Sequence, residues 1–483
     1  MRILFAASEC VPFIKTGGLA DVIGALPKSL AGLSADVRVM LPLYRGIRRS
    51  MGDRLNRVAV FRVPFGISEL DTSVFELTQD GVTCYFIEND RFFDVETIYG
   101  DGMAEGYRFA FFCRAVLEAL PRIGFFPDVL HCNDWQTGLI PMLLKTQYHV
   151  RREYREMRTV FSIHNLKYQG IFPWDEIEAC LGIDRRYYTF EYLEFYGNLS
   201  FLKGGLVFAD RLLTVSPTYA REILLPYYGE LLDGVLRMRR DVLSGILNGI
   251  DTALYDPAAD AGIAGTYSAA DPAGKRLCRR ALRAECGLDA DEGAPLIAMV
   301  TRLTPQKGLD LVARVLDEMI GTGAQFVFLG LGDQGFVNML VDAERRYPGR
   351  VHTHFALDEG LAHRVYAGSD MFLMPSQYEP CGLSQMIALR YGSVPIVRET
   401  GGLKDTVQPY NKYTDEGNGF SFANYNAHEM LYTVQAAVRY YRDDPAMWAR
   451  LMRRGMETDF SWEQSAKEYM TMYEATVRRR KNA

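Results

Sequence analysis

Residues Lys15 to Val22 read KTGGLADV, and a close copy, TGGLKDTV, occupies Thr400 to Val407. Each stretch has two adjacent glycines with an aspartate three residues after the second, at a point where an apolar strand-like run gives way to a helical pattern. Adjacent glycines let the backbone adopt positive φ and approach a ligand closely. The helix N-terminus that follows favours an anion such as phosphate. The pair predicts two similar half-molecules that face one ligand; the alternative is two unrelated Gly-Gly turns.

The segments around the first loop alternate between strand and helix. The apolar run 2–8, the loop, a helix to about Leu33 and the run 36–42 form a β-α-β unit, which predicts a parallel sheet. Residues 57–89 change to alternating apolar and polar positions and contain the turn pair Asp80-Gly81. This texture predicts an antiparallel hairpin inserted into the first domain.

A second regular alternation begins near residue 295 and runs to the second Gly-Gly loop. Before it, residues 256–274 are rich in Ala, Asp, Gly and Pro, as in an exposed connection near a domain boundary. The predicted fold class is therefore α/β, with two doubly wound Rossmann-like domains, 1–246 and 247–460, that face a cleft. Because such sheets bind ligands at the carboxyl ends of their strands, residues directly after strands are the candidates for function.

Composition limits the classes of function. The 483 residues exceed one hydrophobic core, and 48% hydrophobic with 24% charged residues is ordinary for a globular protein. A net charge of −6 offers no general attraction for nucleic acid or an anionic membrane, and no apolar run is long enough to span a bilayer. The N-terminus is too short and too soon charged for a signal peptide, so a cytoplasmic location is expected.

Cofactor and metal chemistry find little support in the sequence. The eight cysteines form no CxxC pair. Asp289-Ala290-Asp291 resembles the D-x-D of some metal-using sugar transferases, but it lies in a polar connector that suits a solvated turn. The stretch 330–335 fits G-x-G-x-x-G, yet no clear ribose-binding acid follows at the expected distance. We interpret it as a phosphate- or sugar-approach loop and predict that neither a metal nor a cofactor is used.

Two cations and one carboxylate define the strongest constellation. Arg302 and Lys307, in TRLTPQKG, bracket the turn after a strand, where they suit a diphosphate; two solvated basic residues are the alternative. Lys15 would add a third cation, and such a cluster would stabilise a departing nucleoside diphosphate. Glu379 follows another strand and suits sugar hydroxyls, although it also suits a helix N-terminus. His164 ends a strand of the first domain, as a substrate contact or a buried imidazole.

The motifs together resemble one family. KTGGLADV, HCNDWQTG, IHNLKYQGIFP, ILNGID, TRLTPQKG, MFLMPSQYEPCGL and ETGGLKDTV are similar, in this order, to those of bacterial glycogen synthases. This family of ADP-glucose-using α-1,4-glucan synthases includes the plant starch synthases. The resemblance implies the GT-B glycosyltransferase fold, with a last helix at 461–483 that crosses back to the first domain. It also implies transfer of glucose from ADP-glucose to the non-reducing end of glycogen, with retention and release of ADP.

The resemblance implies a role for each matching position. The residues near the reaction would be His164, Arg302, Lys307 and Glu379. The donor-binding residues would be Lys15, Gly18, Asp21, Asn165, Asn248, Gly330, Cys381, Gly382, Leu383 and Gly402. The acceptor-side residues would be Trp135, Tyr168 and Gln169. The partners would be ADP-glucose and an α-1,4-glucan; the oligomeric state is left open.

Two departures from the family pattern bear on specificity. Leu357 occupies the place where an aromatic residue usually stacks on the nucleobase, which leaves a UDP-glucose-preferring synthase as an alternative. Leu231 stands where a glycine is usual, in a loop expected to meet the acceptor. A non-catalytic glucan-binding protein on the same scaffold is a further alternative. A nicotinamide oxidoreductase would depend on the single G-x-G-x-x-G, and a phosphorylase would need pyridoxal phosphate.

Overall fold

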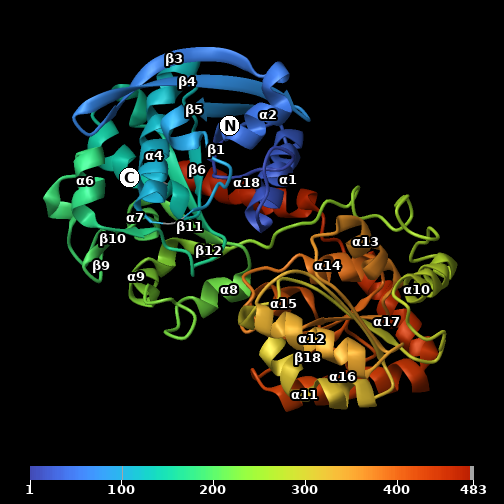
Figure 1. Cartoon of the computed structure of the whole chain (residues 1–483). Coiled ribbons are helices and arrows are strands. Elements are labelled where there is room, and N and C mark those ends of the chain that lie inside the picture. Colours follow the sequence, from blue (N-terminus) through green and yellow to red (C-terminus); the bar gives the residue numbers. More distant parts are fainter. Residues whose placement is uncertain (101, 479–483) are drawn as a thin grey trace. The chain divides into compact units, whose positions relative to one another are not determined.

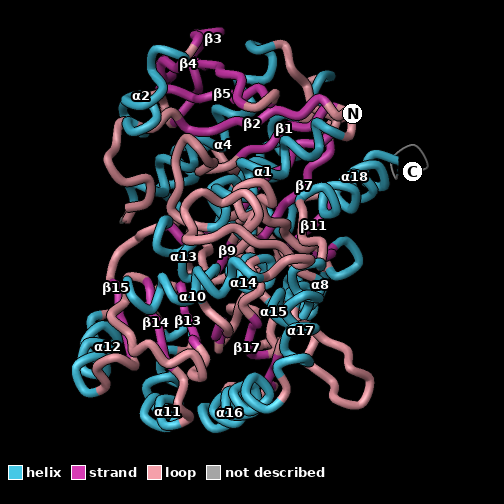
Figure 2. The backbone as a smooth tube through the Cα atoms, turned by 90° about the vertical axis from the view of Figure 1, so that its right-hand side faces the viewer, coloured by secondary structure: helices cyan, strands magenta, loops and turns pink. Residues whose placement is uncertain are grey.

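The computed structural model describes residues 1–100 and 102–478, and the chain divides into two compact units. The first unit contains Met1–Ile246 together with the described residues from Trp462 onward, and the second contains Leu247–Ser461. Figures 1 and 2 show the elements of each unit, which are described separately below. No helix in the described part of the chain is long and apolar enough to cross a membrane.

The first unit is built on a nine-stranded sheet with the order β12-β11-β7-β6-β1-β2-β5-β4-β3. Strand β4 is antiparallel to both its neighbours, and the other pairs are parallel. The strands are β1 (Arg2–Ala6), β2 (Asp36–Pro42), β3 (Asn56–Phe65), β4 (Ser68–Gln79), β5 (Val82–Glu88), β6 (Val129–Asn133), β7 (Arg158–Ile163), β11 (Arg211–Thr214) and β12 (Leu243–Gly245). A small antiparallel sheet adds β8 (Ile171–Phe172), β9 (Glu194–Phe195) and β10 (Asn198–Ser200).

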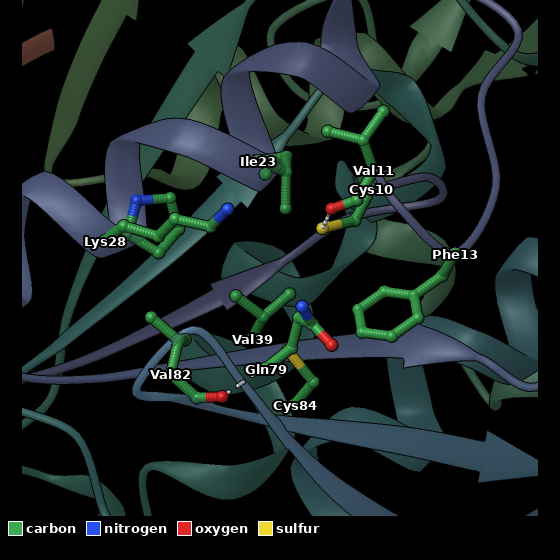
Figure 3. Close-up of a pocket in the computed structure, with 11 residues that line it drawn as sticks. Cys10, Val11, Phe13, Ile23, Lys28, Val39, Gln79, Val82 and Cys84 are labelled. Carbon is green, nitrogen blue, oxygen red and sulfur yellow. Dashed lines mark hydrogen bonds between the residues drawn. The ribbon is translucent and has the colours of Figure 1, made fainter. Parts of the chain in front are cut away.

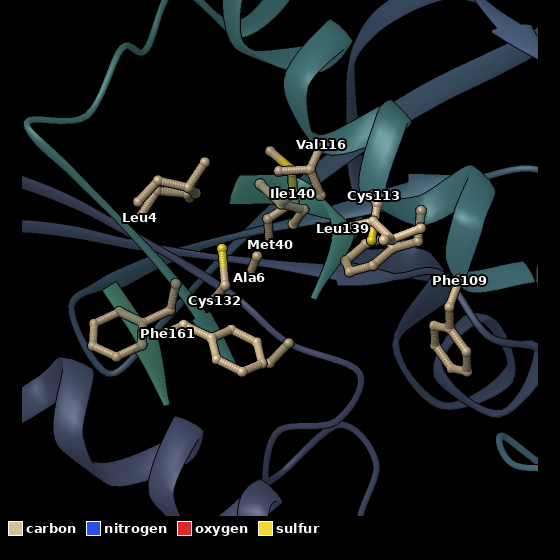
Figure 4. Packing of buried hydrophobic residues seen from close by; sticks show 14 of the residues in the cluster. Leu4, Ala6, Met40, Phe109, Cys113, Val116, Cys132, Leu139, Ile140 and Phe161 are labelled. Carbon is tan, nitrogen blue, oxygen red and sulfur yellow. The ribbon is translucent and has the colours of Figure 1, made fainter. Parts of the chain in front are cut away.

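Helices cover this sheet and seal its core. They are α1 (Gly18–Gly32), α2 (Arg45–Met51), α3 (Asp90–Phe93), α4 (Met103–Ile123), α5 (Leu139–Leu143), α6 (Trp174–Leu181), α7 (Phe201–Phe208), α8 (Pro217–Glu222), α9 (Asp233–Met238) and α18 (Trp462–Arg478). Side chains from the central strands and from α4 and α5 are fully buried together, as Figure 4 shows for Leu4, Cys132, Ile140 and Phe161. Burial of so much apolar surface is the main force that holds the unit together.

The predicted hairpin is present, with one difference. Asp80 and Gly81 both have positive φ, 50° and 79°, and they join Gln79 to Val82 in a two-residue hairpin turn between β4 and β5. Strand β5, however, also pairs in parallel with β2, so it belongs to the doubly wound sheet. The insertion proper is the pair β3 and β4. The alternating pattern alone did not show this double role, because it reports a half-buried strand and not its partners.

The last described helix packs on the first unit. Figure 1 shows α18 beside α1, and four of its side chains join the core of that unit: Trp462, Ala466, Tyr469 and Tyr473. The Tyr473 hydroxyl lies 2.6 Å from Nδ1 of His131, whose Nε2 lies 2.6 Å from the Ser162 hydroxyl. Both ring nitrogens of this buried histidine are therefore satisfied, and burial lowers its pKa to about 3. The helix is fixed by a polar contact as well as by apolar packing.

The second unit has a six-stranded parallel sheet with the order β15-β14-β13-β16-β17-β18. Its strands are β13 (Leu296–Val300), β14 (Gln325–Leu329), β15 (Val351–His354), β16 (Met371–Met374), β17 (Val394–Arg398) and β18 (Phe420–Phe422). Its helices are α10 (Ala273–Glu285), α11 (Leu309–Gly321), α12 (Gln334–Arg346), α13 (Glu359–Gly368), α14 (Ser384–Arg390), α15 (Gly401–Thr406), α16 (Ala427–Asp443) and α17 (Pro445–Glu457). Figure 2 shows α11 and α16 side by side below the strands.

In both units the strand order reverses next to the first strand, between β1 and β6 and between β13 and β16. This is the doubly wound arrangement, so the predicted fold class is confirmed for each unit. Two elements of the second unit lie outside the sequence prediction. Helix α10 follows the connector directly, and β18 has only three residues, too few for a pattern to stand out.

The His131–Tyr473 contact makes a prediction for stability. Replacing Tyr473 by Phe removes the partner of a buried ring nitrogen, so the free energy of unfolding should fall by about 1–3 kcal/mol. Urea unfolding followed by circular dichroism measures the change. Tyr413→Phe, at a side chain that is 86% exposed, is the matched control and should have no effect. Equal stabilities for the two variants would contradict a structural role for this contact.

His131 also predicts a pH dependence of stability. The folded state keeps this ring neutral because burial lowers its pKa to about 3, whereas the unfolded chain binds a proton near the ordinary value of about 6.5. The unfolded state therefore holds more protons between these values, and His131 costs stability as the pH falls below about 6.5, by up to about 1.4 kcal/mol per pH unit. His131→Gln lacks this loss. The stability gap between wild type and His131→Gln should narrow from pH 7 to pH 4.5 in urea unfolding; a constant gap would refute the assignment.

Candidate active site

The candidate residues of the second unit meet at the reversal of its sheet. Arg302 and Lys307 follow β13, and Glu379 follows β16, which is the neighbour of β13. Lys307 ends a short 3₁₀ turn, η7 (Pro305–Lys307), before α11. The carboxyl ends of parallel strands that diverge in this way leave room for a ligand. The structure therefore brings these two cations and this carboxylate to the same edge of the sheet, as the sequence predicts.

Lys307 and Glu379 form a buried ion pair. Nζ of Lys307 lies 2.5 Å from Oε2 of Glu379, and 15% and 8% of the two side chains are exposed. The Ser376 hydroxyl donates to the same carboxylate oxygen at 3.0 Å. Opposite charges held away from water neutralise each other, and removal of either one leaves the other uncompensated. Both residues are predicted site residues, but their contact joins positions 72 residues apart and has no signal in the sequence.

Arg302 differs from Lys307 in its surroundings. Its side chain is exposed, and no carboxylate among the described residues is paired with it. A guanidinium offers a planar fork of donors that suits two phosphate oxygens at once. The unit thus combines one neutralised cation with one that lies open to solvent.

The second Gly-Gly loop owes its glycines to packing. A Cβ atom on Gly401, where φ is +44°, would lie 1.9 Å from the backbone oxygen of Glu379, and one on Gly402 would lie 2.1 Å from that of Cys381. The Gly402 N–H donates to the Glu379 carbonyl at 3.1 Å. The loop therefore holds the Glu379 segment in place, because only glycine permits this approach.

Asn248 and Cys381 lie together beside this segment. The backbone N–H of Asn248 interacts with the Cys381 thiol, and burial raises the pKa of that thiol to about 12. Asn248 is 6% exposed, and within the described residues its buried Oδ1 has no hydrogen-bond partner. A buried acceptor without a donor is costly unless a ligand or water supplies one. Cys381 itself is inert in this state, since the thiol is fully protonated at neutral pH.

Two glycines of the G-x-G-x-x-G stretch are required by packing. Gly330 has φ of 151°, and a Cβ there would lie 1.8 Å from the Thr301 carbonyl oxygen; at Gly332 it would lie 2.2 Å from that of Leu303. Leu303 and Gly332 form a parallel bridge. These two glycines let the loop after β14 pack against the loop that carries Arg302. Backbone packing thus accounts for the two glycines, and the phosphate- or sugar-approach role of the loop stays a prediction.

In the first unit, a buried carboxylate shapes the first Gly-Gly loop. Glu9 follows β1 and accepts through Oε2 from the backbone N–H groups of Thr16, at 2.6 Å, and Gly17, at 3.2 Å. Its other oxygen accepts from the Tyr99 hydroxyl at 3.0 Å. Glu9 is not among the site residues predicted from the sequence. The available signal was an acidic residue directly after a buried strand, where such a group needs several donors.

The glycines of the first loop differ from those of the second. Gly17 has an extended backbone with φ of −156°, so the positive φ expected for this loop is wrong there. A Cβ on Gly17 or Gly18 would meet nothing within 4 Å, so both face open space. Beside them Lys15 forms an ion pair with Asp21 at 2.8 Å, and both side chains are partly exposed. The loop offers a partly exposed cation next to an accessible backbone.

Asp134 holds the segment that carries His164. Its Oδ1 accepts from the backbone N–H of His164 at 2.7 Å, and the N–H of Asn165 also donates to this carboxylate. Asp134 has a positive φ of 55°, which is unusual outside glycine and frequent at functional sites. The His164 ring lies 3.0 Å from Asn133, and burial lowers its pKa to about 4. His164 is therefore neutral at physiological pH and acts as a hydrogen-bonding group without charge.

The predicted acceptor-side residues fall into two groups. The Trp135 ring is only 7% exposed and packs against Phe109, Phe172 and Gly170, so it belongs to the core of the first unit. Its acceptor-side role, which the resemblance implies, stays a prediction. Tyr168 is 51% exposed, and its neighbour Gln169 is buried.

A small pocket lies behind the first loop (Figure 3). Apolar side chains such as Val11, Phe13 and Val39 line it, together with the thiols of Cys10 and Cys84. None of the candidate site residues lines this pocket. Its apolar wall does not suit a phosphorylated sugar, which needs cations and hydrogen-bond donors.

Comparison with known proteins agrees with this arrangement. The model of the starch synthase catalytic domain family matches residues 2–238, and that of the glycosyl transferases group 1 family matches residues 286–448. The chain is 53% identical to the glycogen synthase of Geobacillus thermodenitrificans, over 99% of this chain and 98% of the relative. It is 48% identical to that of Desulforamulus reducens, over 98% of each.

Solved structures point the same way. The catalytic domain of starch synthase IV from Arabidopsis thaliana, bound to ADP and acarbose, matches with a TM-score of 0.90 and 33% identity over 99% of both chains. Sucrose-phosphate synthase from Thermosynechococcus elongatus shares the fold alone, with a TM-score of 0.60 and 17% identity. Two doubly wound units with cations at a sheet reversal define a glycosyltransferase of the GT-B class. The chain belongs to the glycogen synthase family, which confirms the resemblance seen in its motifs.

The buried ion pair predicts how substitutions there affect stability. Lys307→Met leaves the Glu379 carboxylate uncompensated and should lower the free energy of unfolding by about 3–5 kcal/mol. The double variant Lys307→Met/Glu379→Gln should recover most of this loss, which urea unfolding of the four proteins in a double-mutant cycle measures. Lys404→Met is the control, because its pair with Glu399, at 3.6 Å, is partly exposed and should contribute less than about 1 kcal/mol. Additive effects of the two substitutions would contradict the coupling.

Proposed function

We propose that this enzyme transfers glucose from ADP-glucose to the non-reducing end of an α-1,4-glucan, with retention of the anomeric configuration and release of ADP. The observation that carries the proposal is the grouping of Arg302, Lys307 and Glu379 at the reversal of the second sheet. A nucleoside diphosphate sugar carries two phosphates and a ring of hydroxyls. Two cations suit the former, and a carboxylate suits the latter.

Donor binding would change the partners of the ion pair. The phosphates would draw Lys307 and the exposed Arg302, while Glu379 would accept hydrogen bonds from glucose hydroxyls. Because both charges are already held away from water, little reorganisation is needed when negative charge develops on the departing diphosphate. Lys15 could leave Asp21 for a phosphate in the same way, since that pair is partly exposed. Cations that contact the phosphates in this way would stabilise the leaving group.

The remaining proposed roles concern the transferred glucose and the acceptor. Neutral His164 would hydrogen-bond the glucose, with Asn165 beside it and Asp134 fixing both through their backbone N–H groups. The buried Oδ1 of Asn248, which has no hydrogen-bond partner among the described residues, would accept a hydrogen bond from a hydroxyl group of the donor. Gly18, Asp21, Gly382, Leu383 and Gly402 would shape the donor site. Retention is assigned to same-side attack, in which the departing phosphate accepts the proton of the acceptor hydroxyl.

The nucleobase side of the donor site differs from the usual pattern. Leu357, in the place of the usual aromatic, follows β15 and is 87% exposed. Phe355, two residues earlier, packs against the core of the second unit. An exposed leucine offers apolar contact without a π face. Selection of adenine over uracil would accordingly be weaker than where an aromatic residue stacks on the base.

The test measures transfer of labelled glucose to glycogen from ADP-glucose and UDP-glucose in parallel. We expect incorporation from ADP-glucose and a smaller rate from UDP-glucose. Arg302→Ala should lower kcat/KM for ADP-glucose at least about a hundredfold, since it removes a group that stabilises the leaving diphosphate. Arg345→Ala, on the exposed face of α12, is the control and should retain activity. Absence of transfer from either donor by folded protein would refute the proposal.

A further inference from the structure

A tight turn in the first unit holds two non-glycine residues in the left-handed conformation. Glu230 and Leu231 have φ of 47° and 65°, between α8 and α9. Side chains other than Gly, Asn and Asp adopt this conformation at a cost in energy, and a branched apolar residue such as leucine is a poor choice. Leu231 is nevertheless 66% exposed, so packing within the unit offsets little of this cost. An observed outlier of this kind points to a function for the side chain that it displays.

The turn is fastened to the loop that follows His164. Nε2 of Gln169 donates to the Glu230 carbonyl at 2.7 Å. The Gln169 loop leaves the carboxyl end of β7, and α8 and the turn come after β11, which pairs with β7 in parallel. Both segments therefore rise from the same edge of the sheet as His164. A second link joins them, because the Tyr219 hydroxyl of α8 accepts from the Leu166 N–H at 3.2 Å.

Gln169 carries the second, independent observation. Its side chain is 8% exposed, and within the described part of the chain its buried Oε1 has no hydrogen-bond partner. A buried amide oxygen left without a donor is costly, and a hydroxyl group from a ligand would satisfy it. Tyr168, the preceding residue, has a half-exposed aromatic ring, and Leu231, which follows the Glu230 that Gln169 contacts, has an exposed aliphatic group. Apolar groups beside one unpartnered acceptor match a sugar, which has apolar C–H faces and hydroxyl donors.

We propose that Leu231 is a specificity-determining residue that contacts the glucosyl units of the α-1,4-glucan acceptor behind its reacting end. This inference rests on the proposed function, which supplies the glucan. Gln169 places the turn, and the left-handed backbone aims Leu231 outward, where glycine would leave no side chain. The occupant is a glucan, because a buried acceptor without a partner among the described residues, next to exposed apolar side chains, suits a ligand that has both hydroxyl donors and C–H faces. Leu231 sets how strongly short acceptors bind and leaves the donor reaction unaffected.

Three variants distinguish an effect of the Leu231 side chain from an effect of backbone strain in the turn. Leu231→Asn keeps a residue that tolerates the left-handed conformation but removes the apolar group, and Leu231→Met keeps an apolar group. Glu230→Gly is the matched control, because it relieves strain in the same turn without touching Leu231. Initial rates with maltotriose to maltoheptaose at saturating ADP-glucose give KM and kcat for each acceptor. Thermal unfolding confirms that every variant is folded.

We expect Leu231→Asn to raise KM for these acceptors about fivefold, with kcat and the KM for ADP-glucose unchanged, and Leu231→Met to behave as wild type. Glu230→Gly should leave the acceptor KM unchanged and raise Tm by about 2 °C. An unchanged acceptor KM in Leu231→Asn, or the same rise in Glu230→Gly, would overturn the inference. If wild type transfers no glucose, the proposed function fails instead. Calorimetric titration of maltoheptaose without donor then decides whether Leu231 contacts a glucan.

Discussion

Parallel strand pairing is the constraint on which the functional parts of this protein depend. A parallel strand must be followed by a crossover, so every connection that leaves a carboxyl end lies at one edge of the sheet. The strand order reverses between β1 and β6 in one unit and between β13 and β16 in the other, and connections diverge at those points. Glu9 and Asp134 flank the first reversal, and Arg302 and Glu379 flank the second. Parallel pairing thereby brings residues that are distant in sequence to one edge of each sheet.

Near these strand ends, charged side chains are paired with other groups of the protein. Glu379 neutralises Lys307 in the second unit, and Glu9 takes up two backbone N–H groups of the first Gly-Gly loop. Such partners lower the cost of keeping polar groups away from water, and they hold those groups in one geometry. Arg302 and the Lys15–Asp21 pair are more exposed, so they can meet a charged ligand at little cost. A buried charged group and a more exposed cation therefore occur in both units.

The sequence predicts features that depend on neighbours along the chain and fails where distant segments meet. The turn at Asp80-Gly81 lies where the sequence predicts it, because a tight turn depends on neighbouring residues. Ser216 and Pro217 begin α8 in the same local way, with the Ser216 hydroxyl accepting from the Tyr219 N–H. The double pairing of β5, the buried side of Trp135 and the contact between Lys307 and Glu379 all require a partner that no local pattern contains. Tertiary contact decides these features.

The two Gly-Gly loops have similar sequences, but their glycines are under different steric constraints. Gly401 and Gly402 are required by the fold, because a Cβ on either would collide with the backbone at Glu379 or Cys381. Gly17 and Gly18 meet no such restriction, and neither needs a left-handed backbone. A demand for glycine in the first loop must then come from something that approaches it from outside. The second loop supports the carboxylate of the site, whereas the first leaves its backbone open beside Lys15, so their similarity reflects the shared strand-to-helix connection and not a shared role.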